Sequence, residues 1–269
     1  MTFQLKVILV LCIILAISLS IASYFGAFIP ATYEQDAPSM AAQGIGQDMV
    51  DLFLVVPLLL SSLFFMLRNN KSAHFILTGT LFYVVYSFFI YSFGVHFNQM
   101  FLIYCLTLGV SLYAFILMLY QLGSRDVENW FKEKLPVRSI GILLIVIAVM
   151  FYLLWLKDVV PAILAHTVPP SISNYNLLVN PVHVLDLAIA LPGLIIAAIL
   201  LMKKNRFGFI LAPVFLVFII ILTMALAGMV LMLNMKAISD DTSLMGVFIV
   251  LAIISAGFLF LALRNIKAE

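Results

Sequence analysis

The stretch His183-Val-Leu-Asp186-Leu-Ala-Ile-Ala-Leu-Pro192 opens a long apolar run and places two ionisable side chains at its start. Residues three apart lie on one face of an α-helix, so His183 and Asp186 are predicted to be neighbours. The run continues to Lys203, and about 20 apolar residues suffice for a transmembrane helix. An ionisable pair inside such a helix requires a partner or a wet cavity.

The whole chain has the composition of a polytopic membrane protein. Hydrophobic residues make up 65% of its 269 residues and charged residues only 10%, which no ordinary soluble core explains. We therefore expect an all-α, polytopic transmembrane helical bundle of about eight spans, forming a single transmembrane domain over residues 1–269. The predicted spans begin near the following positions: Lys6, Met49, Ala73, Gln99, Ile140, Val182, Phe207 and Ser243.

The positions of Lys and Arg predict the orientation of these spans. If the N-terminus lies inside, 12 of the 14 basic residues are cytoplasmic, and only Lys157 and Lys236 lie outside. Cytoplasmic loops retain Lys and Arg, so both termini are expected in the cytoplasm and the protein in the plasma (cell) membrane. The apolar run over residues 7–29 exceeds the core of a secretory signal, about 7 to 15 residues, and is expected to be retained. The lipid bilayer is the expected partner. Basic clusters occur only beside the spans, so the sequence does not indicate nucleic-acid binding.

The segments between the spans include one predicted extra helix. Apolar residues at helical spacing alternate with charged ones over residues 124–136, which predicts an amphipathic helix on the cytoplasmic leaflet, with a partner-docking helix as the alternative. Residues Pro30 to Gly46 are expected to form a polar external loop. The longest external loop, Lys157 to Asn180, is either a lid over the outer mouth or a simple connection.

An upstream stretch repeats the pattern of the opening one. Asp48-Met-Val-Asp51-Leu-Phe-Leu-Val-Val-Pro57 has Asp-Leu and then Pro at the same spacing, and a basic loop follows each proline at the same distance. The two copies fall in the second and sixth spans, so each half holds four spans. This even number keeps both copies in the same orientation and predicts a parallel 4+4 repeat with halves 1–122 and 139–269. The alternative is convergent use of an N-terminal Asp and a mid-span Pro, both common in membrane helices.

Several polar residues at the starts of spans have a structural explanation. A side-chain oxygen there caps the free amide groups of the first helical turn. This interpretation covers Asp48, Asn98, Asn180 and Asp240, and Asp51 fits the third residue of a capping arrangement. Asp186 does not fit, because it lies about 9 Å along the helix from Asn180, beyond the reach of a cap.

Four residues are the candidate ligand-binding site: Asp51, His96, His183 and Asp186 are predicted to converge near the outer leaflet. Imidazoles with carboxylates suit a divalent transition metal, with His96, His183 and Asp186 as candidate ligands, or a proton relay. A heme held by the two histidines is a weaker alternative, and no particular cofactor is predicted. In the opposing interpretation, each histidine is an interfacial residue bonded to loop backbone. Tyrosine and hydroxyl stripes along residues 83–91 and 104–111 are predicted to supply interhelical hydrogen bonds, with the lining of a pocket below these four residues as the alternative.

Three patterns carry a resemblance to a known family. They are Gly46-Gln-Asp48 with Pro57, Tyr86 through Phe93-Gly94 to Phe97-Asn98, and His183-Val-Leu-Asp186-Leu with Pro192. These patterns resemble those of an uncharacterised family of bacterial multi-pass integral membrane proteins. The resemblance extends from the second to the seventh span and implies no activity, substrate or catalytic residue.

Three functional hypotheses follow from these residues. The first is small-molecule or ion binding and transport through an outward-facing polar cavity with Asp186 and Asp51 as its charged floor. The second is an outer-leaflet enzyme in which His96, His183 and carboxylates hold a metal that activates water. The third is a non-catalytic membrane subunit or sensor. The sequence predicts neither an enzyme class nor an oligomeric state.

Overall fold

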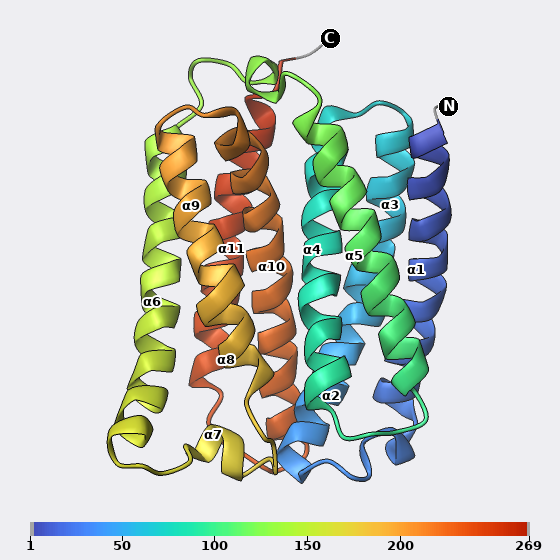
Figure 1. Cartoon of the computed structure of the whole chain (residues 1–269), viewed down its shortest axis with the longest axis vertical. Helices are drawn as coiled ribbons and strands as arrows, with labels where there is room; N and C mark the ends of the chain where they lie inside the picture. Colours follow the sequence, from blue (N-terminus) through green and yellow to red (C-terminus); the bar gives the residue numbers. More distant parts are fainter. Residues whose placement is uncertain (1–2, 268–269) are drawn as a thin grey trace.

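The protein is a bundle of eight membrane-length helical spans, seen in a computed structural model that describes residues 3–267 (Figure 1). Residues 1–2 and 268–269, the ends of the predicted domain 1–269, lie outside the described residues. Over residues 3–267 the structure contains no strand beyond one isolated bridge between Phe131 and Ile266. The predicted all-α, eight-span bundle is confirmed.

Six spans are single helices and two are interrupted. The single helices are α1 (Phe3–Phe28), α4 (Lys71–Gly94), α5 (Phe101–Gly123), α6 (Val137–Leu164), α10 (Arg206–Met235) and α11 (Ser243–Arg264). The interrupted spans are α2, η2 and α3 (Pro38–Val50, Asp51–Val55, Val56–Leu67) and α8, η4 and α9 (Pro181–Leu185, Asp186–Ala190, Leu191–Met202). The connections contain η1 (Pro30–Tyr33), η3 (Val127–Trp130) and α7 (Pro170–Ser173).

The spans form two groups that stand side by side (Figure 1). The first half comprises α1 to α5 and the second half α6 to α11. Helix α10 of the second half packs against both α2 and α4 of the first, while α8 packs against α4. The start of α1 and the end of α11 lie at one end of the bundle, together with 12 of the 14 Lys and Arg residues. We call this the basic end.

The interruptions η2 and η4 are π-helical turns at corresponding places in the two halves. The amide of Val56 donates to the carbonyl of Asp51, five residues earlier, and the amide of Leu191 donates likewise to Asp186. Each turn precedes a 12-residue helix whose second residue is a proline. Proline has no N–H, so it leaves the carbonyl one turn earlier without its usual donor. The backbone before it changes from hydrogen bonds between residues four apart to bonds between residues five apart.

The turns after these two spans also correspond. Asn69 and Lys204 have positive φ angles of 62° and 54°, and the side chains of Asn70 and Asn205 cap the helices that follow. In each pair the residue numbers differ by the same amount as those of Asp51 and Asp186. The two halves thus share the same local structure from the π turn to the start of the next helix.

Close contacts between helices occur at small residues. A Cβ atom on Gly46 of α2 would overlap the backbone carbonyl of Gly228 of α10. In the corresponding place, a Cβ atom on Gly94 of α4 would lie 2.7 Å from Cγ of Pro181 in α8. In membranes, small residues allow helix backbones to approach closely and gain packing contacts. These two crossings join the halves.

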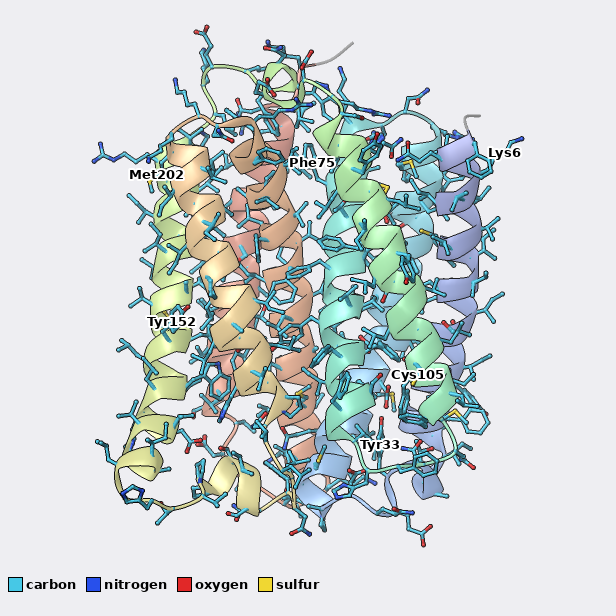
Figure 2. The ribbon with its side chains drawn as sticks, viewed as in Figure 1. Lys6, Tyr33, Phe75, Cys105, Tyr152 and Met202 are labelled. Carbon is cyan, nitrogen blue, oxygen red and sulfur yellow. The ribbon has the colours of Figure 1, made fainter. Side chains whose placement is uncertain are left out.

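The prediction of an amphipathic helix over residues 124–136 is wrong. Only η3 is helical in this segment, and Val127, Phe131 and Leu135 are buried. The ring of Phe131 lies 5.7 Å from that of Phe75, which Figure 2 shows near the basic end of the bundle. The apolar side chains of the segment therefore pack against the helices instead of the lipid.

The Arg206 side chain attaches this segment to the bundle. Its guanidinium donates to the backbone carbonyls of Gly123 and Arg125. Replacing Arg206 with Leu leaves both carbonyls without these bonds, so we expect a loss of about 1–3 kcal/mol of stability, measured by chemical denaturation in detergent. Arg264→Leu, at an exposed arginine of the same end, is the control. Equal stability of the two variants would contradict this role for Arg206.

Candidate functional site

A cavity of about 330 Å³ lies between the two halves. Helices α2 and α4 contribute one side of its wall, and α6, α8, α10 and α11 contribute the other. Tyr33 is part of the wall, and Figure 2 places it at the end of the bundle opposite Lys6. Seven aromatic side chains line the cavity: Tyr33, Tyr86, Tyr91, Phe151, Trp155, Tyr175 and Phe248. The described lining residues include no Lys, Arg or His.

Asp186, the first residue of the π turn η4, lines this cavity. Its side chain is held by two donors from different helices. The hydroxyl of Tyr86 on α4 donates to Oδ1 at 2.9 Å, and Nε1 of Trp155 on α6 donates to Oδ2 at 2.6 Å. These bonds partly compensate the carboxylate for its burial and fix its orientation.

A second carboxylate in the wall, Asp36, lies between η1 and α2. The backbone N–H of His96 donates to its Oδ1 at 3.0 Å, and Nδ1 of the same histidine lies 2.8 Å from that oxygen. The side chain is only 1% exposed. Its Oδ2 is buried and has no hydrogen-bond partner among the described residues. Asp36 therefore retains an acceptor for a ligand.

Asp48 is not the helix cap that the sequence predicts. Helix α2 begins at Pro38, inside the predicted loop, so Asp48 lies near the end of α2 and is 0% exposed. Its carboxyl group accepts hydrogen bonds from the hydroxyls of Tyr33 and, at 3.0 Å, Tyr91. Burial, and next the charge of Asp48, raises the pKa of Tyr33 well above its ordinary value, so Tyr33 is a neutral hydroxyl donor to Asp48. Asp48 lies directly behind two tyrosines of the cavity wall.

Asp51 is also 0% exposed, but it is not among the residues that line the cavity. The hydroxyl of Tyr83 donates to its Oδ1 at 2.8 Å, and the side chain of Gln47 interacts with the same carboxyl group. The tyrosine stripe on α4 thus supplies interhelical hydrogen bonds, as the sequence predicts. The two acids at corresponding places have different surroundings: Asp186 faces the cavity, whereas Asp51 is enclosed in the first half.

His183 does not pair with Asp186. Its ring packs against that of Trp155, with 4.7 Å between centroids, and its Nε2 lies 3.9 Å from Oδ2 of Asp158. The indole of Trp155 contacts both residues, because its ring packs on His183 and its N–H donates to Asp186. An aromatic side chain from another span therefore takes the place of the predicted pair.

The structure does not bring the predicted metal ligands together. His96 contacts Asp36, His183 lies near Asp158, and Asp186 is bonded to Tyr86 and Trp155. Within the described residues, no group of three or more His, Cys, Asp or Glu side chains is arranged to hold a metal ion. The four predicted site residues thus occupy separate environments, and only Asp186 lines the cavity.

One of the predicted helix caps is correct: the side-chain oxygen of Asn180, the N-cap residue of α8, accepts from the amide of Val182 at 2.9 Å. Asn98 accepts from the amide of Met100 at 2.8 Å, but α5 begins only at Phe101, so this bond forms a turn before the helix and does not cap it. The predicted cap Asp240 is wrong: the N-cap residue of α11 is Thr242, and it is Oδ1 of Asp241 that accepts from the amide of Ser243, at 2.9 Å.

Comparison with known proteins leaves the geometry of the cavity as the guide to function. No model of a known family, no characterised protein and no solved structure matches this chain. The resemblance to an uncharacterised bacterial family therefore stays a prediction. What the cavity can do chemically follows from its wall, since carboxylates and aromatic faces both attract cations.

The sequence does not predict three polar residues of the cavity wall, Tyr33, Asp36 and Trp155. Trp155 has a signal, because a tryptophan in an apolar span needs an acceptor for its N–H group. Tyr33 and Asp36 follow α1 in a connection with no regular pattern. Nothing in the sequence indicates that the following helix brings them to the cavity.

Proposed function

We propose that this protein transports a small organic cation across the plasma membrane and binds it in the cavity between its two halves. The observation that supports this function best is the composition of the cavity wall. Two carboxylates, Asp36 and Asp186, and seven aromatic side chains contribute to it, without a basic side chain among the described lining residues. The carboxylates attract the charge of such a ligand, and the aromatic faces add cation–π attraction.

The size and apolar character of the cavity narrow the class of ligand. Its volume of about 330 Å³ falls in the range of small-molecule sites, roughly 300–1,000 Å³. A bare metal ion prefers several oxygen or nitrogen ligands and gains little from an apolar wall. An ammonium group on an apolar body matches both the carboxylates and the apolar wall.

Orientation and internal symmetry support transport in addition to binding. Because cytoplasmic loops retain Lys and Arg, we place the basic end and both termini in the cytoplasm, so that the cavity faces outward. We further infer that the halves 1–122 and 139–269 are a parallel repeat, for which the corresponding π turns, caps and crossings provide support. In many transporters two repeats move against each other around a site at their interface.

The proposal is tested by fluorescence titration. The chain contains two tryptophans, and Trp155 lines the cavity, so Trp130→Phe leaves Trp155 as the single reporter. Benzyltrimethylammonium should change its emission saturably, whereas neopentylbenzene, an uncharged molecule of the same shape, should bind at least about tenfold more weakly, as expected for loss of at least 1.4 kcal/mol.

A variant in the cavity wall makes the test specific. Asp36→Asn should weaken binding of benzyltrimethylammonium, while Asp240→Asn, at an exposed loop residue outside the cavity wall, should not. Equal binding of the charged and uncharged probes, or binding of neither, would overturn the proposed ligand class. Uptake of the labelled cation into proteoliposomes then distinguishes transport from binding alone.

A further inference from the structure

Two carboxyl groups, those of Asp48 and Asp51, are buried close together in the first half. They are separate from Asp186, which lines the cavity in the second half. Asp48, on α2, and Asp51, the first residue of η2, are both 0% exposed and interact electrostatically. Tyrosine hydroxyls hold both of them, those of Tyr33 and Tyr91 at Asp48 and that of Tyr83 at Asp51. No ion pair with Lys, Arg or His reaches either carboxyl group within residues 3–267.

Two negative charges are not stable in this environment. A carboxylate that leaves water for a protein interior loses its hydration, and a like charge nearby adds repulsion. Hydroxyl donors compensate this loss only in part, because they carry no positive charge. At least one of the two carboxyl groups must therefore hold a proton.

The surroundings of Asp48 favour a proton over a metal ion. A Cβ atom on Gly26 of α1 would overlap the Asp48 carboxyl group, so α1 closes that side. The other titratable groups facing it are tyrosines: Tyr33 of η1, Tyr91 of α4 and, beyond Tyr91, Tyr104 of α5, whose ring centroid lies 5.2 Å from that of Tyr91. Their hydroxyls take the positions that additional metal ligands would need.

We propose that Asp48 and Asp51 form a proton-binding site and that Tyr33 and Tyr91 connect it to the cavity. Both tyrosines line the cavity and donate to Asp48. When ionised Asp48 takes up a proton, the Tyr33 O–H bond breaks and its proton forms a bond to Oδ2 of Asp48. The tyrosine oxygen at the same time accepts a proton from a hydronium ion in the cavity, which leaves as water. Release follows the same steps in reverse.

This site goes beyond the proposed function, since it holds a proton whichever organic molecule the cavity binds. Asn resembles a protonated carboxyl group, with one acceptor oxygen and one donor group, so Asp48→Asn and Asp51→Asn imitate the protonated state. Both single variants and the double variant are therefore expected to fold. A protonated carboxyl group also has a C=O stretching band in the infrared that a carboxylate lacks, which makes the proton directly measurable.

Infrared spectroscopy of the full chain in lipid nanodiscs tests the site without any ligand. At neutral pH the wild-type protein should show a protonated carboxyl band that is absent from the Asp48→Asn, Asp51→Asn double variant and unchanged in Asp126→Asn, at an exposed aspartate. The band should shift in Tyr33→Phe and in Tyr91→Phe, because each substitution removes a hydrogen-bond donor to the carboxyl group of Asp48. It should also exchange with deuterium more slowly when both tyrosines are replaced.

Two results would overturn the proposal. If the double Asn variant and the wild-type protein have the same carboxyl bands, neither acid holds a proton. If the double Asn variant does not fold, the two Phe variants decide, and a wild-type band that neither substitution moves excludes Asp48 as its source. Asp186→Asn should keep the infrared band assigned to Asp48 and Asp51. Because binding of the organic cation is measured separately, by fluorescence, either proposal can fail without the other.

Discussion

Replacing Asp186 with Asn should weaken the binding of benzyltrimethylammonium by about 30-fold or more, because removal of one partner from a buried charge pair costs at least about 2 kcal/mol. The side chain of Asp186 lines the cavity and is held by Tyr86 and Trp155. Asn keeps the size of the residue and one acceptor oxygen but removes the negative charge. Titration of Trp155 emission in the Trp130→Phe background measures the change.

The control for this variant is Asp158→Asn. Asp158 accepts a hydrogen bond from Ser171 and lies near His183, but it is not a lining residue of the cavity. The same loss of one charge at this position should leave the affinity within about twofold, since it removes no contact with the ligand. If both variants bind the probe equally well, Asp186 does not contact the cation and the proposed site is incorrect.

Replacing Gly46 with Leu should destabilise the folded protein by about 3 kcal/mol or more, at or above the upper end of the usual range for overpacking. A Cβ atom at this position already overlaps the backbone carbonyl of Gly228, and a backbone atom cannot move aside as a flexible side chain can. Helix α2 would have to separate from α10. Chemical denaturation in detergent, monitored through tryptophan emission, measures this loss of stability.

Gly109→Leu is the matched control for this substitution. Gly109 also lies in a membrane span, on α5, but a Cβ atom there would meet nothing within 4 Å. We expect this variant to unfold close to the wild-type denaturant concentration. A similar loss of stability in both variants would mean that the contact between Gly46 and Gly228 has no special importance.

The spans were predictable from the sequence because their length and apolar composition are local properties. Local reasoning also identified Asp186, whose depth in its span excludes a capping role. The same reasoning misplaced Asp48, because the polar residues and glycines before it resemble a loop. Gln43, Gly44 and Gln47 are polar or small for a different reason: they line the cavity.

The environment of each acid was not predictable, because side chains from distant segments create it. Trp155 reaches Asp186 from α6, and Tyr33 reaches Asp48 from η1. Spacing along one helix can place His183 and Asp186 on a common face, but it does not reveal that an indole from another helix contacts both of them. Periodicity likewise does not distinguish apolar residues that contact lipid from those that contact protein, and for this reason the sequence predicts Phe131 and its neighbours on the membrane surface.

If the two halves are the duplication that we propose, the paired π turns imply an order of events in the ancestry of the chain. Each π turn is followed at the same distance by the proline that changes the helical hydrogen bonding. On the proposed duplication, the π turns that begin at Asp51 and Asp186 descend from one ancestral turn. On the same proposal, the ancestral four-span segment carried the acid, the π turn and the proline before it doubled. The two acids now differ in their surroundings, because Asp51 is bonded to Tyr83 within the first half and Asp186 lies at the cavity between the halves.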